Sequence, residues 1–141
     1  MGHPLAFANK MIDFTTGRGV STTYLCALTA DPGTAAVMTS LSEDNTTGYV
    51  RQAVTWAAPV VPADSSDPKS VSAADVSFGP YTAAQANPIT HLALVTAGSG
   101  TTGEIRYSWA LESPFQAGVG DSMLVSAGSI DYGVFVGDGS A

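Results

Sequence analysis

The chain has 141 residues, of which 12% are charged and 45% are hydrophobic, and its formal net charge is −7 at pH 7. This length suits a single domain with a sizeable core, and the low share of charged residues indicates a surface rich in hydroxyl groups. Five scattered Lys and Arg residues exclude a basic nucleic-acid-binding patch, one cysteine excludes an intrachain disulfide, and no run reaches the ~20 apolar residues of a membrane helix.

The first expected element is a helix near the N-terminus. Apolar residues recur at helical spacing between Pro4 and Phe14: Leu5, Ala8, Met11 and Ile12. Pro4 suits the first turn of a helix, and Gly17 or Gly19 would end it. We therefore predict a helical arm over residues 1–19 and a β domain over residues 20–141. The apolar stripe of the arm has to pack on its own sheet or on a neighbouring subunit.

The rest of the chain is predicted to form short strands separated by turns at roughly ten-residue spacing. Alternating or apolar runs occupy residues 21–29, 48–57, 70–78, 89–95, 105–111, 122–126 and 129–136, and residues 82–87 could form one helical turn. This pattern predicts an all-β fold, a single antiparallel β-sandwich or barrel of jelly-roll-like type with a short N-terminal helix.

A hairpin over residues 89–112 is the predicted centre of the fold. Residues 89–95 are apolar on both faces, which is typical of a strand covered on both sides. In residues 105–111, large apolar or aromatic side chains occupy every second position. A loop rich in Gly, Ser and Thr joins them. The large side chains that we expect in the core are Trp56, Trp109, Leu94 and Phe78, together with the small Cys26.

The longest expected loop covers residues 57–69, with three prolines and two acidic residues in the run APVVPADSSDPK. Prolines exclude a central strand, so we expect an exposed tip or an arm that reaches a partner.

No motif of the chain carries recognisable chemistry. Residues 98–103 match G-x-G-x-x-G, but an alternating strand pattern follows where the dinucleotide fingerprint needs a helix. His91 has no second ligand at metal-binding spacing, and the aspartates near the C-terminus lack a calcium-loop pattern. Without a G-x-S-x-G elbow or a recognisable acid pair, we assign no catalytic, cofactor-binding or metal-binding residue. A small hydrolase is the least favoured alternative.

Four segments, taken together, resemble a family of small structural proteins of tailed bacteriophages. They are TTYLCALTADPGT (22–34), TGYVRQAVTWAAP (47–59), VSAADVSFGPYTA (71–83) and ITHLALVTAGSGTTGEIRYSWALESPFQAGVGDSMLVSAGSI (89–130). Members of this family are labelled tail-fibre proteins or capsid decoration (cement) proteins.

The resemblance implies a non-enzymatic virion protein, made in the host cytoplasm. We expect a decoration protein on the outer capsid surface that binds the major capsid protein and stabilises capsomer contacts. We expect a homotrimer, with no nucleic acid, membrane or cofactor as partner. The alternative is a minor tail or tail-fibre component.

The segments best placed to reach a partner are the N-terminal helix and the long loop. The helix supplies apolar area, and the loop supplies negative charge on a stiff backbone. The predicted partner-binding residues are Leu5, Phe7, Met11, Ile12, Phe14, Asp64 and Asp67.

Overall fold

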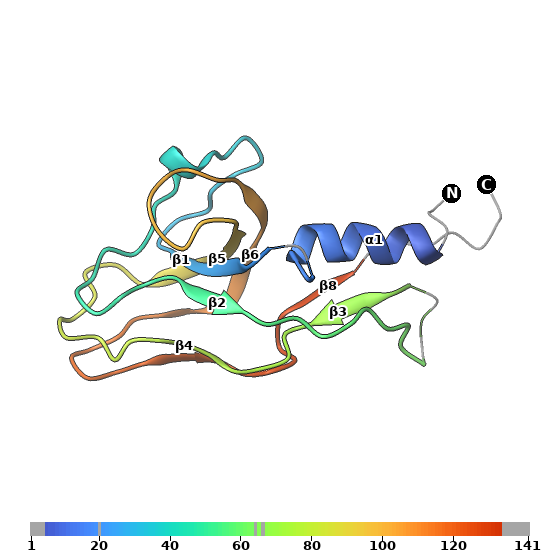
Figure 1. Cartoon of the computed structure of the whole chain (residues 1–141). Coiled ribbons are helices and arrows are strands. Elements are labelled where there is room, and N and C mark those ends of the chain that lie inside the picture. The colour runs from blue at the N-terminus through green and yellow to red at the C-terminus, as the bar shows by residue number, and fades with distance from the viewer. Residues whose placement is uncertain (1–4, 20, 64, 66, 134–141) are drawn as a thin grey trace.

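The computed structural model describes residues 5–19, 21–63, 65 and 67–133. Its elements are helix α1 (Leu5–Thr16), the short 3-10 helix η1 (Met38–Ser40) and strands β1 (Thr23–Leu28), β2 (Gln52–Val54), β3 (Lys69–Val71), β4 (Val76–Phe78), β5 (Ile89–Val95), β6 (Ile105–Phe115), β7 (Met123–Val125) and β8 (Asp131–Gly133). Every strand pairing is antiparallel. The predicted all-β fold with one N-terminal helix is confirmed (Figure 1).

The largest sheet has four strands in the order β2-β1-β5-β6. The predicted hairpin forms its β5–β6 pair, and β5 lies inside the sheet, between β1 and β6. Leu92 and Leu94 face one buried cluster, whereas Ala93 and Val95 face another with Cys26. Apolar residues on both faces of this strand are therefore covered on both sides, as the sequence predicts.

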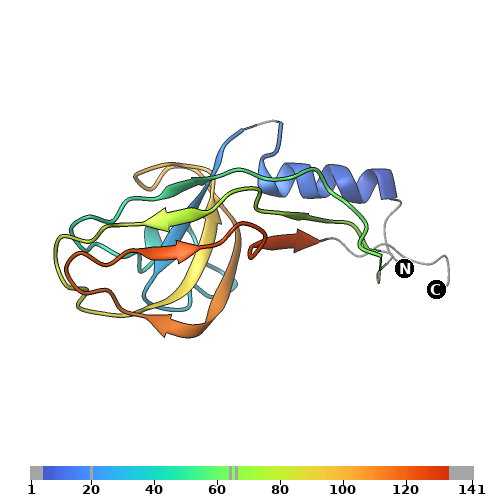
Figure 2. The same ribbon diagram turned by 90° about the horizontal axis from the view of Figure 1, so that it is seen from below.

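The β4–β7 ribbon forms a second layer over the sheet, as the view from below shows (Figure 2). Val76 and Phe78 of β4 and Met123 of β7 pack in one cluster with Leu25 and Leu92 of the sheet. Because residues from both layers fill this cluster, the main core lies between the sheet and the ribbon.

Helix α1 lies beside the third pair of strands, β3–β8, to one side of the sheet (Figure 1). Its Ala8 and Ile12 are fully buried and pack with Tyr132 of β8. A chain of hydrogen bonds ties its last turn to the sheet: the Thr23 hydroxyl donates to the Thr16 carbonyl at 2.5 Å, and the Trp56 indole donates to the Thr23 hydroxyl at 3.1 Å. The helix is thus an integral part of the fold.

Several strands are shorter than predicted. The run 48–57 contributes only Gln52–Val54, and the run 70–78 divides into β3 and β4. The chain bends at residues 73–74 between them, where the Ala73 amide donates to the Thr55 carbonyl at 2.7 Å and Asp75 accepts a hydrogen bond from the Ala127 amide at 2.7 Å. Of the predicted strand 129–136, residues 131–133 form β8 and residues 134–136 lie outside the described part.

Two other expectations need correction. Residues 82–87 form no helical turn, because the Gln85 amide donates to the Ala117 carbonyl and its side chain binds Asp44. Trp109 is only half-buried, unlike Trp56, Phe78, Leu94 and Cys26, which are buried as predicted. It lies on β6, which is the last strand of its sheet.

Candidate functional site

The most prominent exposed apolar surface belongs to α1. We call it the α1 outer face, and it consists of Phe7, Met11 and Phe14; the exposed Leu5 lies at the start of the helix on the side of Ala8 and Ile12. The side chains of Phe7 and Phe14 are 52% and 62% exposed. Phe7, Met11 and Phe14 border a shallow hollow of about 270 Å³. Exposed aromatic rings around a hollow are typical of a surface that binds another macromolecule.

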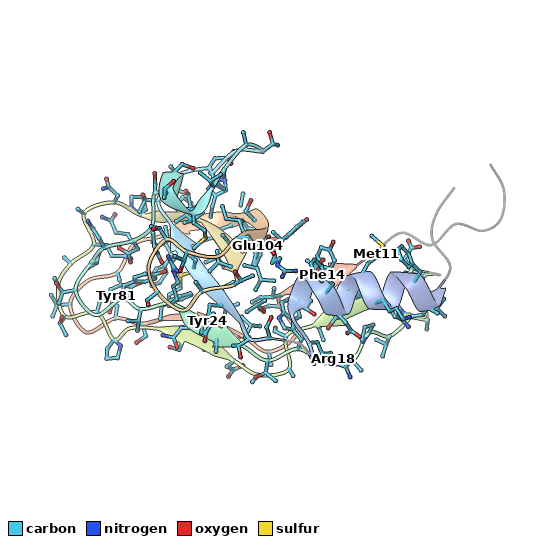
Figure 3. All side chains as sticks on the ribbon, turned by 45° about the horizontal axis from the view of Figure 1, so that its top comes forward. Met11, Phe14, Arg18, Tyr24, Tyr81 and Glu104 are labelled. Atoms are coloured by element: carbon cyan, nitrogen blue, oxygen red, sulfur yellow. The ribbon has the colours of Figure 1, made fainter. Side chains whose placement is uncertain are left out.

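Arg106 of β6 holds one end of this face. Its guanidinium lies 4.1 Å from the centre of the Phe14 ring and donates a hydrogen bond to the Phe14 carbonyl at 2.7 Å. Figure 3 shows Phe14 at the end of α1 nearest the sheet and Met11 farther out along the helix. Since the opposite side of the helix is buried, the outer face is presented in one orientation.

The structure separates the predicted partner-binding residues. Phe7 and Phe14 are exposed on the α1 outer face with the half-buried Met11, whereas Leu5 is exposed at the start of the helix on the side of Ala8 and Ile12. Ile12 is fully buried against the chain's own β8, so it is not available at this surface. Asp67 is half-buried, and Asp64 lies outside the described residues.

Two valines that sequence reasoning did not select add exposed apolar surface at the same end of the molecule. Val60 is 59% exposed and Val61 is 42% exposed, and Val60 pairs with Lys69 at the start of β3. Figure 1 shows this β2–β3 connection extending in the same direction as α1. Two consecutive valines between prolines in an otherwise polar loop were the available signal.

A polar cluster lies at the other end of β1. Arg51 donates to Glu43 twice, at 2.7 and 2.8 Å, and to the carbonyls of Ala97 and Gly100 at 2.9 and 2.8 Å. Its side chain is only 5% exposed. The guanidinium therefore joins the loop before β2 to the glycine-rich β5–β6 loop, which is a structural task.

Cys26 and Tyr49 complete this polar cluster. The Tyr49 hydroxyl donates to Glu43 at 2.6 Å and the Cys26 thiol donates to it at 3.1 Å. Burial and the bond to Glu43 raise the pKa of Cys26 to about 12. Cys26 is therefore a protonated thiol at neutral pH rather than a nucleophile.

The other motifs have structural surroundings. The β5–β6 loop leads into strand β6 rather than a helix, and the Nδ1 atom of His91 lies 2.9 Å from the Thr90 hydroxyl. Within the described residues, no three His, Cys, Asp or Glu side chains gather to hold a metal ion. The described part also has no helix long and apolar enough to cross a membrane.

Taken together, the fold and its surfaces define a small antiparallel β module whose most distinctive exposed feature is an apolar helix face. A comparison with protein families matches residues 6–133 to the family described as Podophage GP4 fiber I protein gp80. The match covers most of the chain, from α1 to β8, and the chain belongs to this family of phage structural proteins. A search of curated proteins found no match.

Proposed function

We propose that this protein is a non-enzymatic fibre component of a phage virion, attached to a neighbouring virion protein through the α1 outer face. The observation that carries this proposal is the family match, which spans nearly every described element and names a podophage fibre protein. The exposed aromatic rings of α1 supply the surface that such an attachment needs.

The exposed rings of α1 supply part of the area that a stable contact of about 800 Å² per partner needs. A phenylalanine side chain buries about 200 Å² in an interface, so the exposed fractions of Phe7 and Phe14 leave roughly 230 Å² to be covered. At about 25 cal/mol per Å², covering both rings contributes about 6 kcal/mol before association costs are subtracted. Lys10 borders the same hollow, so the complementary partner surface is an apolar pocket with an acidic rim.

This attachment can be tested with paired substitutions. Phe7→Ser with Phe14→Ser should remove most binding to the virion, whereas Val119→Ser, at a valine that is 71% exposed away from the helix, should leave binding intact. The assay is co-sedimentation of purified variant protein with virions that lack the native copy. Equal binding of both variants would show that the attachment surface lies elsewhere.

A second candidate is a capsid decoration protein bound to the major capsid protein. Its support is the resemblance of segments 22–34, 47–59, 71–83 and 89–130 to a family that includes such proteins. Gold-labelled protein on purified virions separates the two roles. Label on the tail supports the fibre role, label over the whole head supports decoration, and no label opposes both.

We further propose that the protein forms a homotrimer. Large apolar patches on an isolated subunit mark an interface, and Val60 and Val61 expose apolar area outside the α1 outer face. Light scattering coupled to size-exclusion chromatography measures the mass directly. A mass of one subunit at micromolar concentration would refute the trimer.

A further inference from the structure

Strands β6 and β7 follow each other in the chain, yet they do not pair. β6 bonds to β5 and β7 bonds to β4. Among the described residues, no backbone hydrogen bond joins one to the other. A groove of about 730 Å³ lies between them, lined by residues from Trp109 to Phe115 on one side and from Met123 to Ile130 on the other.

The groove continues past the end of β7. A second hollow of about 220 Å³ adjoins it and shares Trp109, Ser129 and Ile130 with it. This hollow extends the groove to Tyr107 on β6 and to Asp131 at the start of β8. One side of the groove is therefore a continuous strand, and the opposite side runs in the reverse direction.

Both sides of the groove offer unused backbone groups. Each strand has one bonded neighbour, so alternate N–H and C=O groups on its other edge have no strand partner. An extended peptide placed in the groove could bond to β6 on one side and to β7 on the other. Such a peptide would join the sheet to the β4–β7 ribbon.

The hydrophobic core is incompletely covered along the groove between β6 and β7. Four large apolar side chains that pack against the main core remain only partly buried beside the groove: Trp109, Leu111, Phe115 and Val125. An inserted strand with alternating apolar residues would cover them on the side where the layers separate. Trp109 is half-exposed because it borders this groove.

The local sequence limits the length of the insert. Pro114 has no N–H, and residues 111–114 bulge between the pairs Ile89–Phe115 and His91–Ala110. An insert opposite residues 109–113 therefore meets regular backbone only up to Ala110 and has to follow the bulge from there to Pro114. A five-residue strand spans roughly 17 Å and fits this stretch.

The charges of the groove select the occupant. The one charged side chain that lines the groove itself is the exposed carboxylate Glu112, while Asp131 of the adjoining hollow pairs with Lys69 at 3.3 Å, and the whole chain has a net charge of −7. A partner segment with Lys or Arg flanking the apolar stretch complements this negative charge, whereas a second acidic copy of this chain does not.

We propose that the β6–β7 groove binds an extended segment of another protein, with alternating apolar residues and basic flanks, by insertion as an additional β-strand. The groove is formed by different residues from those of the α1 outer face, so this inference does not depend on the fibre role.

The test uses a synthetic peptide, Lys-Val-Thr-Val-Thr-Val-Lys with blocked ends, added to the ¹⁵N-labelled full chain. Insertion predicts saturable chemical-shift changes concentrated at the amides of residues 109–113 and 123–126. Two further peptides, N-methylated at odd or at even residues, keep the side chains and lose the backbone donors of one edge. Both should bind at least tenfold more weakly, because an inserted strand uses both of its edges.

Charge variants provide the matched controls. A peptide with Glu flanks should bind at least threefold more weakly than the Lys-flanked peptide, and Glu112→Lys should reverse that preference. Asp31→Lys makes the same charge change at a residue outside the groove lining and should leave the preference unaltered.

Four results would overturn the proposal: no binding at millimolar peptide, shifts centred outside the groove, N-methylated peptides that bind equally well, or groove amides that shift with protein concentration alone. The last result would assign the groove to a second copy of the chain.

Discussion

Arg51 offers the sharpest test of how the fold positions its loops. Its guanidinium makes two bonds to Glu43 and two to carbonyls of the β5–β6 loop while its side chain is 5% exposed. Arg51→Met keeps the aliphatic volume and removes all four bonds. Removing one partner of a fully buried pair costs about 3–5 kcal/mol. Glu43 is 24% exposed and retains Tyr49 and Cys26 as donors, so we expect a loss of about 2–4 kcal/mol.

Urea unfolding measures this loss, and a surface ion pair supplies the control. Lys69→Met removes a pair with Asp131 in which both side chains are 41% or more exposed, so it should cost less than about 1 kcal/mol. Hydrogen exchange should also accelerate at residues 97–103 in Arg51→Met and remain unchanged in the control. If Arg51→Met were no less stable than Lys69→Met, the structural role assigned to this cluster would be wrong.

Three further predictions concern stability and reactivity. Phe78→Ala, at a fully buried residue, should lower the free energy of unfolding by about 3–5 kcal/mol in the same urea assay, and a loss below 1 kcal/mol would contradict the described core. Burial raises the pKa of Glu43, but hydrogen bonds from Arg51, Tyr49 and Cys26 outweigh it and hold the pKa below the 4.5 of a free glutamate side chain. The carboxylate therefore stabilises the fold above about pH 4.5, and this contribution should be lost as the pH falls through the folded-state pKa; the acid limb of a stability–pH profile should be less steep in Glu43→Gln. Cys26, fully buried with a pKa of about 12, should resist iodoacetamide at pH 8 until the protein unfolds, and mass spectrometry showing rapid native-state alkylation would refute its placement.

Patterns within one segment were predictable from the sequence. The two apolar faces of residues 89–95 placed β5 inside a sheet, and the helical spacing before Gly17 located α1 to within a few residues. Both features are local, because hydrophobic periodicity and the residues that begin or end an element lie close together in the sequence.

Which face of α1 stays exposed was not predictable, because apolar residues occur on two sides of the helix. The structure buries Ala8 and Ile12 and exposes Phe7 and Phe14. That choice depends on Tyr132 and Arg106, which lie far away in the sequence. The unpaired edges of β6 and β7 are hidden for a similar reason: alternation identifies a strand but not its neighbours.

The position of the protein on the virion tests the central proposal most directly. A cryo-electron microscopy map of the intact phage, at a resolution that distinguishes side chains, would be fitted with the fold of residues 5–133. The fibre role predicts that the fold fits density in a fibre, with Phe7 and Phe14 covered by a neighbouring protein. A map in which the fold fits no fibre density, or in which it fits with the α1 outer face open to solvent, would contradict the proposal.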